Sequence, residues 1–325
     1  MRAVRQFFLV ACLSGALSAV AQTGVRPATP RVVAYVEAAL EHGDLASASA
    51  LVAQYRRLNG DTPEALEAFS WVARGELAAG QTEQASKDAD EIERSCQTAL
   101  ATRSIDSEPH LALALGAAYE IQAEVLYRAH KRAEALQLLQ TNLRKWRGTS
   151  LAGRLQKNIN LLTLEGKPMP PLRETAWIGT KPPPETTWRG KVLLIFFWAH
   201  WCADCKAEAP VIAHLAAEFE PKGLVMVAPT QHYGYTAEQD NVPPAKETQY
   251  IEKVFEKYYA GIPKAQVPLD SSNFERFGAS TTPTIVVVDR HGIVRLYHPG
   301  VMDEASLRAV IEPLIAQHPS ERASR

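Results

Sequence analysis

Cysteine is scarce in this sequence, with only 4 among 325 residues. So few cysteines cannot form the disulfide framework on which small secreted domains depend. An excess of charge of one sign is also lacking, because 35 basic residues nearly balance 36 acidic ones and leave a formal net charge of −1. This balance argues against nucleic acid as a partner and against a long basic surface for membrane binding.

Long apolar runs are lacking everywhere except at the N-terminus. There, Arg2 and Arg5 precede an apolar stretch over residues 7–20, which ends in small residues. This order is typical of a cleavable secretory signal, expected over residues 1–21, and the stretch is short for a membrane span. We therefore expect a periplasmic or otherwise exported protein that is soluble after cleavage. The residues just before Cys12 resemble a lipoprotein cleavage site, so a lipid anchor there is the alternative.

Groups of metal ligands are lacking as well. The 9 histidines are scattered without the spacing of a ligand pair, and a single Cys-X-X-Cys occurs, at Cys202 and Cys205. The alternative, a zinc site that includes this pair, would need two further ligands, and the sequence has no second Cys-X-X-Cys or close pair of histidines to supply them. We expect no metal and no bound cofactor, and we expect His200, beside the pair, to be a surface residue.

The composition changes near residues 163–171, and the length suffices for two domains. Residues 22–165 are rich in Ala, Leu, Glu, Gln and Arg with helical spacing, whereas residues 166–325 alternate strands and helices between Pro-rich connectors. The sequence therefore predicts an all-α domain followed by an α/β domain. In the second domain, the order of elements predicts a mixed sheet with helices on both faces.

Three turns of the first domain share one local pattern. Each separates two helices and is followed five residues later by a small alanine; the pairs are Gly43 with Ala48, Gly80 with Ala85 and His130 with Ala135. The pattern resembles the helical hairpin of tetratricopeptide repeats, in which a small residue lets the helices pack closely. The spacing of the turns is irregular, so a helical bundle without repeats is the alternative. Cys96, in a helical stretch, is expected to be a buried thiol or, alternatively, a link to a partner.

The most informative residues are 198–210. An apolar run predicts a buried strand over 191–198, and the next helix is expected to begin at Cys202. Unpaired N–H groups and the positive end of the helix dipole stabilise a thiolate at that position, so we expect Cys202 to be exposed and reactive. Cys205 lies within disulfide reach, which is typical of a redox-active pair.

The rest of the second domain follows from similar patterns. Further strands are expected over 224–228, 284–288 and 293–297, and helices over 202–219, 245–259 and 304–316, the last of them capped by Asp303. An insertion over 230–244 carries aromatic residues, so it is expected either to line a substrate groove or to be a solvated loop.

Several short motifs surround the cysteine pair: Gly190-Lys191, Phe197-Trp198-Ala199, Trp201-Cys202, Cys205-Lys206, Glu208, Pro210 and Thr282-Pro283-Thr284. Over residues 172–318 they resemble a thioredoxin-fold domain of the TlpA-like thiol:disulfide oxidoreductases. This resemblance implies reversible dithiol–disulfide exchange, with Cys202 as the nucleophile and Cys205 as the resolving thiol. It also implies a cis-proline at Pro283 and a substrate-binding surface formed by Trp201, Thr282 and Pro283.

The sequence departs from thioredoxins proper at two places. Phe196 stands where they carry a buried aspartate, so Glu208 is the candidate for proton transfer with Cys205, with an ordinary surface glutamate as the alternative. Asp204 lies between the cysteines, and its charge disfavours the thiolate, which favours a reducing protein. Ala199 also occupies the place that peroxidases of related outline fill with Thr, which argues against peroxidase chemistry.

The combined prediction is an exported thiol:disulfide reductase of protein disulfides. The resemblance implies that its electrons come from a membrane thiol donor, and the helical domain would dock a protein partner. Electron delivery for cytochrome c maturation is a narrower alternative. The other alternative is a redox-sensing adaptor or scaffold that acts through its helical domain.

Overall fold

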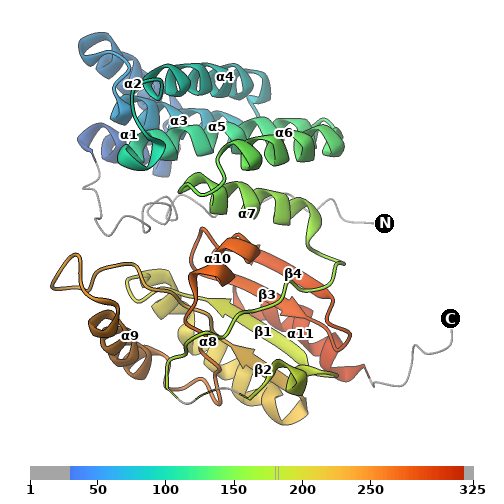
Figure 1. Ribbon diagram of the computed structural model, residues 1–325. Helices are drawn as coiled ribbons and strands as arrows, with labels where there is room; N and C mark the ends of the chain where they lie inside the picture. Colours follow the sequence, from blue (N-terminus) through green and yellow to red (C-terminus); the bar gives the residue numbers. More distant parts are fainter. Residues whose placement is uncertain (1–29, 180, 182, 318–325) are drawn as a thin grey trace. The chain divides into compact units, whose positions relative to one another are not determined.

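The structure is a computed structural model that describes residues 30–179, 181 and 183–317 (Figure 1). The expected signal peptide and Cys12 lie outside these residues. The chain divides between Leu155 and Gln156 into two compact units, which are described separately below. Among the residues described, no helix has both the length and the apolar character needed to cross a membrane.

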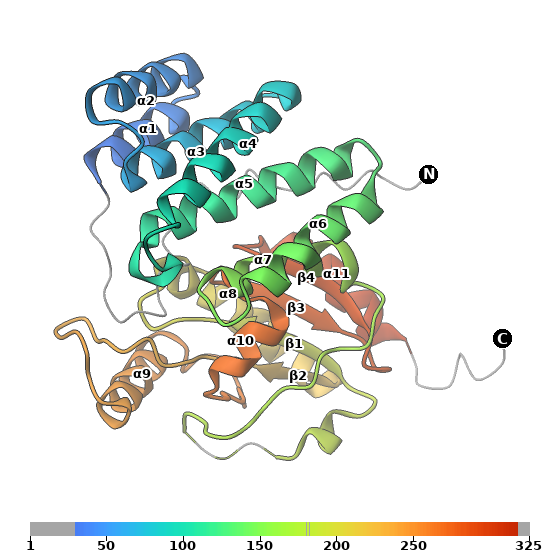
Figure 2. The ribbon, with the colours of Figure 1, turned by 45° about the horizontal axis from the view of Figure 1, so that its top comes forward.

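The first unit consists of helical hairpins. They are formed by α1 (Arg31–Glu41) with α2 (Leu45–Asn59), α3 (Pro63–Ala78) with α4 (Thr82–Ala99), and α5 (Pro109–Arg128) with α6 (Arg132–Lys145). Each hairpin packs against the next, as Figure 2 shows. Side chains at the helix starts cap free backbone N–H groups: Asp44 accepts from Ser47 N, and Thr62 accepts from Ala65 N.

The predicted turns lie between the helices of each hairpin. Gly43, Gly80 and His130 have the positive φ angles, 75°, 80° and 61°, that end a helix sharply. The alanine that follows each turn, Ala48, Ala85 or Ala135, is fully buried. Cys96 is fully buried in α4, where burial raises the pKa of its thiol to about 12. It therefore lies out of reach of a partner.

The second unit is built on a four-stranded mixed sheet in the order β2-β1-β3-β4 (Figure 1). Strand β1 (Val192–Phe197) pairs in parallel with β2 (Leu224–Val227) and antiparallel with β3 (Thr284–Val288), which pairs antiparallel with β4 (Val294–Pro299). All six residues of β1 are buried, as expected of a central strand covered on both faces.

Helices cover both faces of this sheet, as predicted. Alternate β1 side chains, such as Leu194 and Phe196, pack with residues of α8 (Ala203–Phe219), α9 (Pro244–Tyr258) and α11 (Glu304–Ala316). The intervening ones, such as Ile195 and Phe197, pack with α10 (Ser271–Phe277). The fold is thus the expected thioredoxin-like one, and the Asp303 cap on Ser306 N is confirmed. Helix α10 was not predicted.

The boundary between the units differs from the expected one after residue 165. It falls inside α7 (Leu151–Thr163), because the second half of that helix packs in the α/β unit. Asn160 Nδ2 donates to the Phe277 carbonyl oxygen at 2.8 Å, and Leu164 belongs to the α10 side of the core. Helix α7 ends at Thr163, and the Pro-rich segment at 168–171 lies within the second unit.

Candidate active site

The cysteine pair lies where β1 leads into α8. Cys202 is the N-cap residue of the helix, and its Sγ accepts from the backbone N–H of Cys205 at 3.0 Å. The two cysteines form a disulfide, with their Cα atoms 5.3 Å apart. In the reduced protein, the same N–H group and the helix dipole stabilise a thiolate on Cys202.

Cys202 is not exposed as expected, because only 3% of the residue is accessible. The Thr282 carbonyl oxygen lies 3.5 Å from its Sγ. Cys205 is fully buried, so Cys202 is the more accessible residue of the pair. A substrate sulfur must therefore reach Cys202 past the backbone of Thr282.

The backbone at Thr282 lies beside the cysteine pair, directly before β3. The Thr282–Pro283 peptide bond is cis, and β3 begins directly after it. Thr282 is 8% exposed, and its Oγ1 is buried without a hydrogen-bond partner. The Pro283 carbonyl accepts from Gly300 N at 2.8 Å, which fixes this segment from the other side.

Glu208 lies on α8 one turn after Cys205 and is buried, not on the surface. Its Oε1 accepts from the backbone N–H of Met302 at 2.8 Å, while Oε2 is buried without a partner. Burial raises the pKa of this carboxyl to about 7; the charge of Asp204 adds to the rise, and the Met302 bond opposes it. Such a carboxyl takes up and releases a proton near neutral pH.

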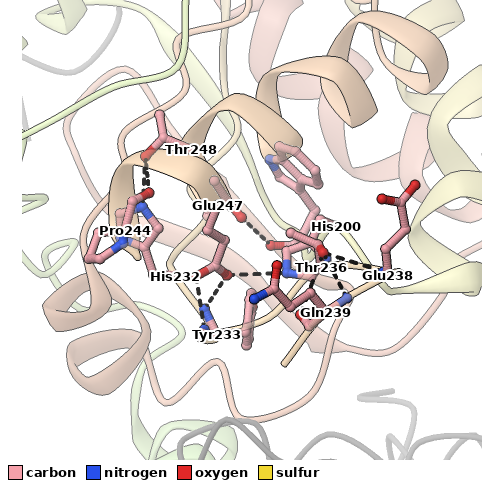
Figure 3. Close-up of polar contacts among 12 residues, drawn as sticks. His200, His232, Tyr233, Thr236, Glu238, Gln239, Pro244, Glu247 and Thr248 are labelled. Carbon is pink, nitrogen blue, oxygen red and sulfur yellow. Dashed lines mark hydrogen bonds and ion pairs between the residues drawn. The ribbon is translucent and has the colours of Figure 1, made fainter. Parts of the chain in front are cut away.

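His200 is also buried, with 1% of the residue accessible, so the expected surface position is wrong. Its Nε2 lies 3.3 Å from Glu247 Oε1 (Figure 3). Three tyrosine rings surround the imidazole with their centroids 5.2–5.4 Å away, namely Tyr233, Tyr235 and Tyr250. No sequence pattern pointed to Glu247, which lies among other charged residues of α9.

Trp201 is partly buried beside Cys202, and its ring meets that of Tyr233 edge to face with centroids 5.5 Å apart. Its Nε1 is buried without a partner. Because Tyr233 is only 4% exposed, the insertion at 230–244 is not simply a solvated loop. Over the described part of the chain, no three His, Cys, Asp or Glu side chains are grouped so that they could hold a metal ion.

Comparisons with known proteins agree with this geometry. The family model described as Redoxin matches residues 164–311. The thiol:disulfide interchange protein DsbE of Pseudomonas fluorescens biotype C is 30% identical over 143 residues, which are 44% of this chain and 71% of that protein. DsbE of Xylella fastidiosa is 25% identical over 129 residues, which are 39% of this chain, and the match spans about half of that relative, 56% of its length.

Among solved structures, a thiol:disulfide interchange protein of the thioredoxin family from Chlorobium tepidum is similar to 47% of this chain over 99% of its own length. The two are 19% identical, with a TM-score of 0.37. The residues matched by the Redoxin family model lie in the unit that carries the Cys202–Cys205 disulfide. Through this unit, the chain belongs to the redoxin family of thiol:disulfide oxidoreductases.

Proposed function

We propose that this protein is an exported thiol:disulfide oxidoreductase that reduces disulfide bonds in other proteins. The observation that carries the proposal is the Cys202–Cys205 disulfide at the start of α8, with Cys202 facing the Thr282 carbonyl next to a cis-proline. A pair at that place can alternate between dithiol and disulfide, since the helix terminus stabilises the thiolate on one of its members.

The reaction proceeds in two exchange steps. The Cys202 thiolate attacks one sulfur of the substrate disulfide; the substrate S–S bond breaks, and the leaving thiolate takes up a proton. Cys205 then loses its proton and attacks Cys202 Sγ, which breaks the mixed disulfide and releases the second substrate thiol. Two electrons have passed from the dithiol to the substrate, and a thiol donor at the membrane would restore the dithiol.

Glu208 is the proposed proton acceptor for Cys205. Both side chains are buried on α8 three residues apart, which places them on the same side of the helix. The Oε2 atom of Glu208 has no partner, and its pKa of about 7 suits a group that must be ionised to accept a proton and neutral afterwards. Phe196, in the adjacent strand, supplies no carboxylate for this task.

Trp201, Thr282 and Pro283 are the proposed substrate-binding residues. The Thr282 carbonyl lies 3.5 Å from Cys202 Sγ, so an extended substrate segment that reaches Cys202 can pair with this backbone like an added strand. The aromatic face of Trp201 is suited to an apolar side chain beside the substrate cysteine.

The direction of exchange is proposed from Asp204. Its carboxylate, between the two cysteines, disfavours the Cys202 thiolate and so favours the disulfide form, which makes the dithiol a better reductant. Export to the periplasm or an equivalent compartment, and a signal peptide, are proposed from the N-terminal sequence.

The helical unit is proposed to dock a partner. Its consecutive hairpins, each with a buried alanine after the turn, support a tetratricopeptide-like stack, and such stacks usually bind other proteins. The same observation supports a second candidate function, a redox-sensing adaptor that acts through this unit. Capture of a partner that is unaffected by loss of both thiols would favour the adaptor.

Matched cysteine variants test the oxidoreductase. With Cys205→Ser, we expect a stable mixed disulfide with a disulfide-bonded protein such as insulin, because the resolving thiol is missing; with Cys202→Ser, we expect none. The wild-type reduction potential, measured against glutathione, should lie near the value of thioredoxin, about −270 mV. A potential near about −120 mV, that of a strong oxidant, would refute the direction. No reversible couple at all would refute the proposed activity.

A further inference from the structure

The insertion at 230–244 is an ordered element that lies against the redox site. Tyr235 and Asp240 form an isolated antiparallel bridge, and Thr236 N donates to the Gln239 carbonyl at 2.9 Å to close the turn between them. At its base, Val242 N donates to the Gly234 carbonyl at 2.9 Å. The insertion is therefore a small hairpin, and its position depends on what holds that base.

Glu247 of α9 holds the base of the insertion and the cysteine motif together (Figure 3). Its Oε1 accepts from the backbone N–H of Tyr233 and lies 3.3 Å from His200 Nε2. Its Oε2 accepts from Gly234 N at 2.9 Å. Both carboxylate oxygens thus have hydrogen-bonding partners, and these partners come from two segments that are far apart in the chain.

This carboxylate is 1% exposed, and it is stabilised by its partners rather than by water. Burial acts to raise its pKa, but the hydrogen bonds from His200, Tyr233 and Gly234 outweigh burial and hold the pKa below the ordinary value. A buried charge with several donors is costly to leave unpaired. Loss of the carboxylate should therefore release the base of the insertion while leaving the disulfide, in α8, intact.

The contacts continue from Glu247 to the residue beside the nucleophile. The Tyr233 ring packs edge to face on His200 and on Trp201, and the Tyr235 ring packs on His200 from another side. Tyr235 is partly exposed, whereas Tyr233 is buried. Tyr233 thus supports Trp201 from within, and Tyr235 is accessible to an incoming chain.

We propose that Glu247 is a positioning residue for the binding of protein substrates. It holds the insertion so that Tyr235, with Trp201, forms an aromatic wall for an apolar side chain next to the substrate cysteine. This inference rests on the proposed function, since it assigns a role in binding the same substrates. A small disulfide that reaches Cys202 without touching the wall should be insensitive to Glu247.

The variant Glu247→Gln tests this role. Glutamine keeps the size of the side chain, but one of the two carboxylate oxygens is replaced by an NH₂ group. In either orientation of the amide, this NH₂ group faces a backbone N–H that the carboxylate had accepted from, so that hydrogen bond is lost. We expect the KM for insulin to rise about tenfold, with kcat, the reduction potential and the rate on hydroxyethyl disulfide unchanged. Glu256→Gln, an exposed position on the same helix, is the matched control and should match the wild type.

A second variant tests the same surface without changing Glu247, so that a general loss of structure in Glu247→Gln can be recognised. Tyr235→Ala removes the accessible ring and leaves the Glu247 contacts in place, so it should raise the KM for insulin by a similar factor. The proposal would be overturned if Glu247→Gln lost activity equally on insulin and on hydroxyethyl disulfide. An unchanged KM for insulin with either variant would overturn it as well.

Hydrogen exchange of the insertion separates this proposal from the proposed function. In Glu247→Gln, the amides of Tyr233 and Gly234 should exchange at least tenfold faster than in the wild type and in Glu256→Gln. If the wild type reduces neither disulfide, the proposed function fails and the role of Glu247 in substrate binding fails with it. Unchanged exchange would overturn the positioning role even in an active enzyme.

Discussion

Replacement of Glu208 by Gln is the most direct test of how the redox site handles protons. The carboxyl is 5% exposed and keeps one hydrogen bond, from Met302 N to Oε1. Gln keeps that acceptor and the shape of the side chain but cannot ionise. The comparison therefore isolates what ionisation of Glu208 does to the folded protein.

The magnitude follows from the two pKa values. In the folded protein the pKa of Glu208 is raised from 4.5 to about 7, chiefly by burial. Each pH unit between the folded and unfolded values corresponds to about 1.4 kcal/mol, so ionisation costs the folded state roughly 3 kcal/mol. Between these pH values, the folded protein holds a proton that the unfolded chain has lost, so stability falls as the pH rises. The stability that the protonated Glu208 carboxyl contributes is complete at pH values below the pKa in the unfolded chain, and it is lost at pH values above the pKa in the folded protein.

Urea unfolding of the oxidised full-length chain at several pH values measures this contribution. Hydrogen exchange of β1 and β3 peptides would report on the α/β unit alone, and the disulfide removes thiol titration from the comparison. Relative to Glu208→Gln, the wild type should lose roughly 3 kcal/mol of stability between about pH 4.5 and pH 8. A difference that does not change with pH would refute the raised pKa. In turnover, the variant should slow resolution by Cys205 about 100-fold or more.

Two further substitutions test the structure around the site. Gly278→Ala, at a φ of +58°, would place a Cβ in collision with the backbone N of Lys157, whereas Gly292→Ala, at a φ of +77°, meets nothing within 4 Å. In urea unfolding, Gly278→Ala should therefore destabilise the protein by at least about 2 kcal/mol more than Gly292→Ala, and equal losses would contradict the packing of α7. Asp204→Asn should raise the reduction potential by tens of millivolts, on the scale of about 30 mV for 1.4 kcal/mol, because the Cys202 thiolate is then less disfavoured. A glutathione equilibrium that gives an unchanged or lower potential would contradict this.

The features that were predictable from the sequence depend on local physics. The apolar run of β1, the cysteines at the start of α8 and the Asp303 cap each follow from a few adjacent residues. The turns at Gly43 and Gly80 follow from a glycine where the backbone needs a positive φ. Helix α10 carries similar signals, an Asp270 cap on Ser272 N and Gly278 in the left-handed region after its last turn, but its seven residues are too few for periodicity to register.

The features that the sequence did not reveal depend on distant residues. Cys202 is covered by the backbone of Thr282, 80 positions later, and His200 is buried by a carboxylate 47 positions later. No local pattern joins such partners, because burial at these places is decided by the packing of separate elements against one motif. The boundary inside α7 has the same origin, since Phe277 and Gly278 hold the second half of that helix.

Two buried glutamates flank the redox site, and their surroundings assign them opposite roles. Glu208 has one donor for two oxygens, so burial dominates and its pKa rises to about 7. Glu247 has donors on both oxygens, so its pKa falls despite burial. A carboxyl with an empty acceptor site can exchange its proton during turnover, whereas a fully bonded carboxylate stays charged and fixes its neighbours in place. The number of donors around each group, more than its depth, therefore separates the proposed proton carrier from the proposed positioning residue.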